Sequence, residues 1–195
     1  IKNTNDEDEI YYRQMLKDFI LILSNTCMRF GECRQLKWKD IKVLNDENQT
    51  LEIQLRKEIT KNRKNRKVVS NGSRYIKRIK KYTKNHKSED WVFCHKDKKQ
   101  SSSENVLSRN TLYKHWNNFV DFSKINDGNK HFSFYSLRHF GITEKLRTGV
   151  SVDLLSKMCG TGIRYIQTHY SHTDVSDDVF REELTRVNRK SKILT

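Results

Sequence analysis

Three short stretches of this sequence carry cations in places where they could do chemistry. They read "CMRFGE", "YSLRHFG" and "TKNRKN", and each sets an arginine or lysine beside a break in local structure. A guanidinium is planar and permanently charged, so it can bridge two phosphate oxygens, which a lysine cannot do. A lone arginine after an apolar helix is usually a surface residue whose stem packs on the protein. The interpretation therefore depends on the stretches occurring together.

A fourth stretch, "YIQTHYSH", adds a phenol. Tyr170 has His169 and His172 on either side of it, in a helix that we expect to follow two glycines. A tyrosine oxygen can act as a nucleophile when its proton is removed. Such a tyrosine is by itself more often a core or surface residue. Its combination with the arginines makes it a candidate nucleophile.

The positive charge of the chain is concentrated in one segment. The net charge is +15, and residues 57–100 hold 16 Lys or Arg against four acidic residues, which gives +12 in that segment alone. Clustered cations neutralise backbone phosphates and bind them with little sequence information. The sequence therefore predicts a nucleic-acid face.

Several classes of protein do not fit this sequence. Its longest apolar run, "FILIL", is far shorter than the roughly 20 residues of a membrane span, so we expect a soluble protein. The four cysteines form no CxxC pair, which argues against a disulfide framework or a zinc site. There is no GxxxxGK[ST] loop and no carboxylate cluster for two metal ions. We expect no cofactor and no metal.

Periodicity predicts a mostly helical α+β domain with a small three-stranded antiparallel sheet. Apolar residues at steps of three and four give helices, and a step of two gives strands. Gly31 is expected to break the helical register between the first helix and a short second one, and Leu112, Trp116, Phe119 and Val120 are expected to face inward. The predicted helices are 9–27, 32–38, 73–87, 111–125, 134–149, 151–160, 163–172 and 176–190, and the predicted strands are 41–44, 50–56 and 66–70.

The stretch "TCMRFGECRQLKWKDI" resembles the block T-G-x-R-x-G-E-x-x-x-L-x-W-x-D-I of the tyrosine recombinases, the phage-integrase class, whose fold also resembles type IB topoisomerases. The resemblance implies that Arg29 is the first catalytic arginine and Glu32 its companion. "YSLRHFGITEKLRTG" is similar to the family's H-x-L-R-H block and implies that Arg138 is the second catalytic arginine, with His139 as a supporting residue. "CGTGIRYIQTHYSH" keeps the family spacing to the nucleophile, which would be Tyr170.

The resemblance also implies a general-acid lysine in the turn before the third strand. Counting back seven positions from Val68 gives Lys61, although Lys57, Lys64 and Lys67 lie in the same hairpin. Two family histidine positions differ here, because Tyr135 and Thr161 occupy them. Both side chains can still hydrogen-bond a phosphate oxygen. The nearby histidines, His139, His169 and His172, could supply the missing base.

The family's activity would be site-specific recombination or integration of phage or mobile-element DNA through a 3′-phosphotyrosyl intermediate. Two alternatives remain: a catalytically impaired DNA-binding relative, and a relaxing type IB topoisomerase. The implied partner is double-stranded DNA, contacted by Arg63, Lys64, Arg66 and Lys67. By resemblance we expect a homotetramer on DNA, a monomer or weak oligomer without it, and a location in the bacterial cytoplasm at the nucleoid.

The expected catalytic domain spans residues 1–172. Residues 173–195 would form a tail with an amphipathic helix that neighbouring protomers exchange. The opening "IKNTNDEDEI" suggests a piece of a longer protein, whose amino-terminal core-binding domain would lie outside this sequence.

Overall fold

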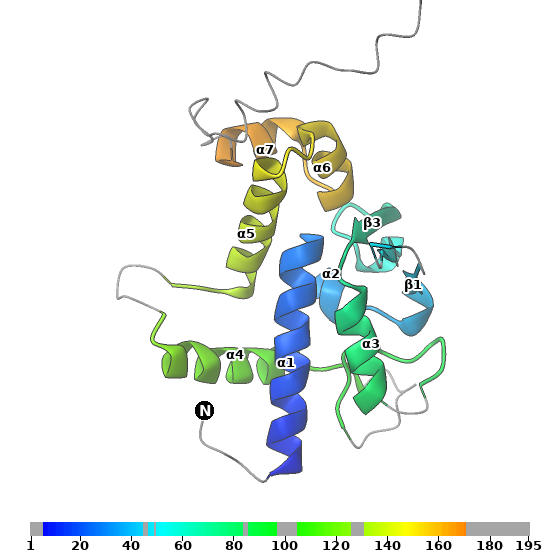
Figure 1. Ribbon diagram of the computed structural model, residues 1–195, viewed down its shortest axis with the longest axis vertical. Coiled ribbons are helices and arrows are strands. Elements are labelled where there is room, and N and C mark those ends of the chain that lie inside the picture. Colours follow the sequence, from blue (N-terminus) through cyan, green and yellow to red (C-terminus); the bar gives the residue numbers. More distant parts are fainter. Residues whose placement is uncertain are drawn as a thin grey trace, which may run out of the picture. The chain divides into compact units, whose positions relative to one another are not determined.

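The computed structural model describes residues 6–44, 47–48, 50–83, 86–96, 105–125 and 131–170. The chain falls into two compact units, Ile1–Gly141 and Ile142–Thr195, which we describe separately. Helices dominate the described residues, together with one three-stranded antiparallel sheet, which confirms the predicted fold class (Figure 1). No described helix is long and apolar enough to cross a bilayer.

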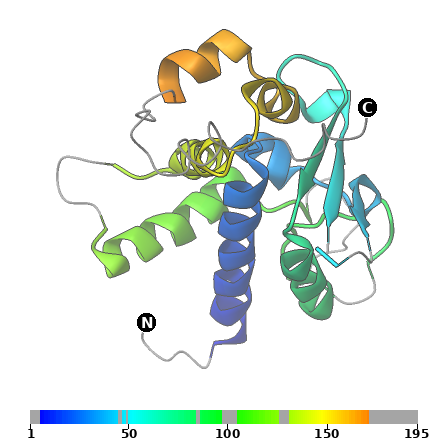
Figure 2. The ribbon, with the colours of Figure 1, turned by 45° about the horizontal axis from the view of Figure 1, so that its top comes forward.

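Helix α1, Glu7–Thr26, is the centre of the first unit. Asp6 caps it by accepting a hydrogen bond from the Asp8 amide at 2.9 Å, and acidic residues in its first turn complement the helix dipole. In Figures 1 and 2, α1 lies between α4, Arg109–Ser123, on one side and the sheet with α3, Ser73–Tyr82, on the other. The helix ends at Cys27, whose φ of 54° is in the left-handed region.

The sheet has the strand order β1-β2-β3, with β1 at Ile41–Val43, β2 at Leu51–Leu55 and β3 at Arg66–Ser70. Its register pairs Ile53 with Val68 and Leu55 with Arg66. Side chains alternate between the two faces of a strand, and Leu51, Ile53, Leu55 and Val68 are fully buried. All three predicted strands are confirmed.

The other elements largely follow the predicted ranges. The register break expected at Gly31 lies instead at Cys27, whose left-handed backbone ends α1, and Gly31 itself is inside the short helix α2 with a φ that is not positive. Phe119 is 41% exposed; Leu112, Trp116 and Val120 form the buried i, i+4, i+8 stripe, so the inward prediction for Phe119 was wrong. The remaining elements are α2 Phe30–Arg34, η1 Trp38–Asp40, η2 Lys57–Ile59, α5 Phe134–Arg147, α6 Val152–Cys159 and α7 Ile163–Tyr170.

An aromatic cluster fixes the amino-terminal half of α5 to α1. The Phe19 ring meets the rings of Phe93 and Phe134 edge to face, at centroid distances of 4.9 and 5.3 Å. About two turns further along α5, Gly141 lies so close to α1 that a Cβ atom there would be 2.0 Å from the Ser24 carbonyl oxygen. Only a glycine permits this approach of the two helices.

Candidate active site

Arg29 begins helix α2 at the junction with α1. Its backbone is extended, and it is the N-cap residue of α2. Glu32, three residues on, accepts hydrogen bonds from the Arg29 amide at 2.8 Å and from the Arg29 Nη1 at 3.0 Å. The reciprocal contact of an N-cap residue with a glutamate three positions later is a common start of a helix. The predicted companion role of Glu32 therefore has a geometric basis in the hydrogen bonds to Arg29.

Arg138 reaches the same junction from α5. Its side chain is buried, at 4% exposure, and its Nη1 donates to the carbonyl oxygen of Cys27. Cys27 precedes Arg29 by only two residues, so the two predicted catalytic arginines, which are far apart in the sequence, lie at the same turn. The left-handed backbone of Cys27 and the close approach at Gly141 both belong to this meeting point.

Glu32 has a second cationic partner that the sequence analysis did not assign to it. Arg66 Nη1 donates to Oε1 at 2.9 Å and Arg66 Nη2 donates to Oε2 at 2.6 Å. The Glu32 side chain is 1% exposed. Burial alone would raise the pKa of Glu32, but the hydrogen bonds and charge of Arg66, with those of Arg29, outweigh burial and lower the pKa. Glu32 is thus a buried, ionised carboxylate between two arginines.

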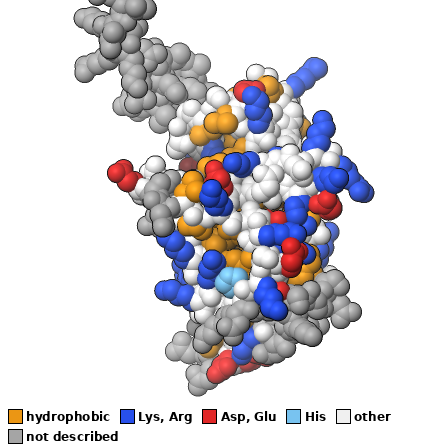
Figure 3. Space-filling model, turned by 90° about the vertical axis from the view of Figure 1, so that its right-hand side faces the viewer, with side chains coloured by type: hydrophobic (Ala, Val, Ile, Leu, Met, Phe, Trp, Pro, Cys, Tyr) orange, Lys and Arg blue, Asp and Glu red, His pale blue; other side chains and the backbone are white. Residues whose placement is uncertain are grey.

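Lys61 lies at the tip of the hairpin between β2 and β3. The hairpin is closed by hydrogen bonds from the Lys57 amide to Asn65 Oδ1 at 2.7 Å and from Thr60 Oγ1 to the Lys64 carbonyl at 2.9 Å. Lys61, the predicted general acid, is exposed, and so are three of the four predicted DNA-contacting residues, Arg63, Lys64 and Lys67. The fourth, Arg66, is 9% exposed. Lysine and arginine side chains project along the face shown in Figure 3.

Tyr135 stands in the first turn of α5, three residues before Arg138. It is 49% exposed, and its ring meets the His139 ring edge to face at 4.5 Å. His139 therefore contacts the residue that replaces the family histidine.

The second unit carries the other two predicted catalytic residues. Thr161 lies in the turn after α6, where its carbonyl accepts from Ser156 Oγ at 2.6 Å. Tyr170 is the last residue of α7, and its side chain is 5% exposed. His169 stacks on Tyr165 at 4.0 Å. His172 and the predicted tail helix, 173–195, lie outside the described residues.

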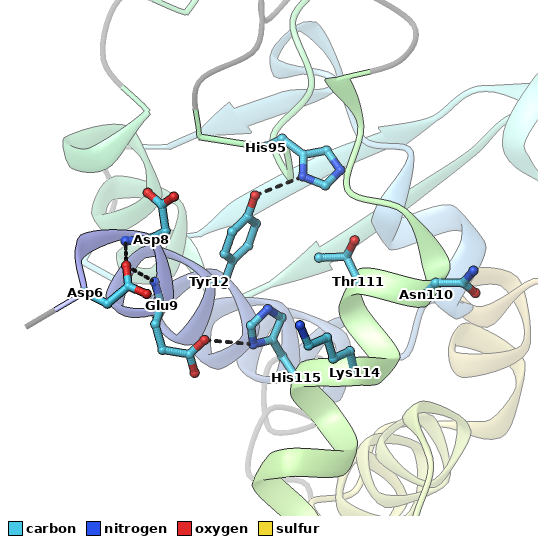
Figure 4. A pocket seen from close by; sticks show the side chains of 9 residues that line it. All are labelled: Asp6, Asp8, Glu9, Tyr12, His95, Asn110, Thr111, Lys114 and His115. Atoms are coloured by element: carbon cyan, nitrogen blue, oxygen red, sulfur yellow. Dashed lines mark hydrogen bonds and ion pairs between the residues drawn. The ribbon is translucent and has the colours of Figure 1, made fainter. Parts of the chain in front are cut away.

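A separate cavity of about 540 Å³ opens between the start of α1 and α4 (Figure 4). The Tyr12 hydroxyl and His95 Nδ1 share a hydrogen bond of 3.0 Å, and the Tyr12 ring stacks on the His115 ring. Burial lowers the pKa of His115, against the opposing effect of Glu9. None of the predicted catalytic residues lines this cavity. Within the described part of the chain, no group of His, Cys, Asp or Glu could hold a metal ion.

Comparisons with known proteins agree with the predicted family. Residues 1–176 match the model of the phage integrase family. No curated protein matches the chain at the level required for a relative.

Similar solved structures include the XerH site-specific recombinase bound to difH substrate, at 19% identity and a TM-score of 0.60 over 91% of this chain and 52% of that one. The XerA recombinase is 20% identical, with a TM-score of 0.61 over 95% of this chain and 65% of that one. The Tn1549 transposon integrase in complex with transposon right end DNA is 20% identical, with a TM-score of 0.62 over 92% of this chain and 60% of that one. These chains share the fold, and this chain spans only about half to two thirds of their length. The family match over most of the sequence shows that the chain belongs to the phage integrase family.

Proposed function

We propose that this chain is the catalytic domain of a site-specific DNA recombinase that cuts and rejoins DNA through a 3′-phosphotyrosyl intermediate, for integration or excision of a phage or mobile element. The observation that carries the proposal is the meeting of Arg29 and Arg138 at the α1–α2 junction, where Arg138 donates to the Cys27 carbonyl. Family membership over residues 1–176 supports the same reaction.

The two arginines suit the charge that develops at phosphorus. Attack on a phosphodiester adds negative charge to the non-bridging oxygens, and each guanidinium can offer two parallel N–H donors to them. Preorganised donors of this kind contribute roughly 10²–10³-fold in rate each. Tyr135 and Thr161 add hydroxyl donors in place of the family's histidines.

In the proposed cleavage step, the Tyr170 oxygen forms a bond to phosphorus and the bond from phosphorus to the 5′ oxygen breaks. The Lys61 ammonium gives a proton to the leaving oxygen, and the phenolic proton passes to a base, for which His139, His169 and His172 are the candidates. The new phosphotyrosyl bond keeps the energy of the broken linkage. A 5′ hydroxyl from a second strand can therefore reverse the step without ATP.

DNA binding is assigned to the exposed cations of the hairpin, Arg63, Lys64 and Lys67. With contacts of this type, the logarithm of the DNA-binding constant falls linearly with the logarithm of the salt concentration. For assembly, we propose four protomers on two DNA sites that exchange the tail of residues 173–195. Deleting this tail should prevent DNA-dependent assembly in sedimentation, and unchanged assembly would contradict the exchange.

The test is covalent capture on nicked duplexes of randomised sequence. The nick lets a short 5′ fragment diffuse away, so a cleaved complex stays trapped as an adduct that resists denaturant. An adduct with the parent chain and none with Tyr170→Phe supports the proposal, and sequencing the trapped DNA identifies the site. Salt-sensitive binding with no adduct favours the catalytically impaired relative, whereas relaxation of supercoiled DNA without strand exchange favours a topoisomerase.

A further inference from the structure

Arg66 differs from the cations around it. The Lys67 side chain is 55% exposed, whereas that of Arg66 is 9% exposed. The two residues are neighbours on β3, so their side chains lie on opposite faces of the sheet. Arg66 shares its face with the buried Val68. An arginine on the inner face is badly placed to meet a DNA phosphate and well placed to act inside the protein.

The Glu32 carboxylate divides its oxygens equally between two arginines. Each oxygen accepts one hydrogen bond from Arg66 and one from Arg29: Oε1 from the two Nη1 atoms, and Oε2 from Arg66 Nη2 and the Arg29 amide. The two parallel bonds from Arg66 fix the plane and rotation of the carboxylate. The carboxylate in turn fixes the Arg29 backbone and one of its guanidinium nitrogens. Arg66 and Arg29 are thereby linked through one carboxylate.

A different arginine anchors the other strand of the hairpin. Arg56 Nε donates to Asp40 at 2.9 Å, and Arg56 Nη2 donates to the Gln35 carbonyl at 2.9 Å. These partners of Arg56 do not include Glu32. The hairpin that carries Lys61 thus has an anchor that is separate from the link between Arg66 and Arg29.

We propose that Arg66 is a positioning residue for phosphodiester cleavage, which orients Arg29 through Glu32 and does not contribute a phosphate contact. The inference rests on the proposed function, since it assigns Arg29 to the transition state. Displacement of a catalytic group by about 1 Å can cost roughly 10²-fold in rate. Loss of a phosphate contact would instead weaken DNA binding and reduce the salt slope by about one.

The experiment compares Arg66→Gln with Lys64→Ala on a nicked duplex that carries the trapped cleavage site. Adduct formation is timed in a single turnover at saturating DNA, and Kd is measured over a series of KCl concentrations. Arg66→Gln should slow the adduct about 100-fold with Kd and salt slope unchanged, whereas Lys64→Ala should weaken Kd and lower the slope. A weaker Kd with a lower slope for Arg66→Gln, or an unchanged rate, would overturn the inference.

A substrate with sulfur in place of the leaving 5′ oxygen tests the route. A thiolate leaves without a proton, so this substrate should restore the rate of adduct formation in Lys61→Ala. The rate of Arg66→Gln should stay low. Restoration of Arg66→Gln would mean that Arg66 acts through the Lys61 hairpin, and this also overturns the inference.

Two further variants guard against simple loss of folding. Glu32→Gln with Arg66→Gln removes the buried charge along with its partner, so the double variant should fold and remain as slow as either single variant. Arg34→Gln, on α2 with a bond to the Leu107 carbonyl, is the control and should react at the parent rate. If the rate losses of the two single variants multiply in the double variant, Arg66 does not act through Glu32. A parent chain that forms no adduct overturns the proposed function itself, and this inference with it.

Discussion

Replacement of Gly141 by alanine tests the contact between α5 and α1 on which Arg138 depends. The added Cβ would lie 2.0 Å from the Ser24 carbonyl oxygen and 2.9 Å from the Cys27 sulfur. Carbon and oxygen atoms in close contact are about 3.3 Å apart, so the helices must separate by roughly 1.3 Å. The nearest obstacle is backbone, which cannot rotate away. We therefore expect the upper end of the overpacking range, about 3 kcal/mol.

This magnitude can be measured by urea unfolding. With a slope of about 2 kcal/mol per molar urea, the midpoint of Gly141→Ala should fall by roughly 1.5 M. The separation also moves Arg138 away from the Cys27 carbonyl, so adduct formation should fall by roughly 10² or more in the protein that remains folded. The matched control is Gly31→Ala, where the nearest atom to a new Cβ is 3.9 Å away. Its midpoint should be unchanged or slightly higher, because alanine favours a helix.

A Gly141→Ala protein that unfolds at the parent midpoint and keeps full activity would refute the argument. It would mean that the two helices have room for a methyl group, and that Arg138 does not depend on their close approach. A lower midpoint with full activity would separate stability from the placement of Arg138.

Three other outcomes follow from the buried groups. The lowered pKa of Glu32 gives stability above its ordinary value of 4.5 that is lost as pH falls through the folded pKa, and Glu32→Gln should remove this loss in unfolding curves taken from pH 7 to 3. Arg78→Met leaves Asp18, which is fully buried, without its bidentate partner, and the free energy of unfolding should fall by about 3 kcal/mol; no change in a urea titration would contradict this pairing. All four cysteines are buried, and burial raises the pKa of Cys33 and Cys94, so a thiol reagent should label the native chain only after denaturant is added.

The sequence predicted the elements well because their signals are local. A period of two is enough to find β3, and Ser151 and Gly160 are the cap residues expected for α6, with Gly160 at a φ of 60°. The resemblance of "TCMRFGECRQLKWKDI" to the family block predicted Arg29 and Glu32 as companions, and the two residues are joined by hydrogen bonds. What a local pattern cannot give is a partner 34 residues away, such as Arg66 for Glu32.

Arg66 could nevertheless have been distinguished from its neighbours. It precedes Val68 by two positions on a strand, so alternation alone puts it on the buried face. The run of cations in the hairpin conceals that difference, because net charge does not depend on which face of a strand a cation occupies. Phe119 is a different case: it flanks the buried stripe of α4, and helical periodicity alone does not separate a flanking position from the stripe.

The arrangement of Arg29, Glu32 and Arg66 also has an evolutionary consequence. A buried carboxylate that loses one cation becomes costly, whereas loss of the carboxylate together with Arg66 removes the cost. Positions 32 and 66 should therefore change as a pair among related sequences, with an apolar or amide residue at one accompanying a non-arginine at the other. Position 29 should resist change even where the pair is replaced, because the proposed reaction also requires its guanidinium.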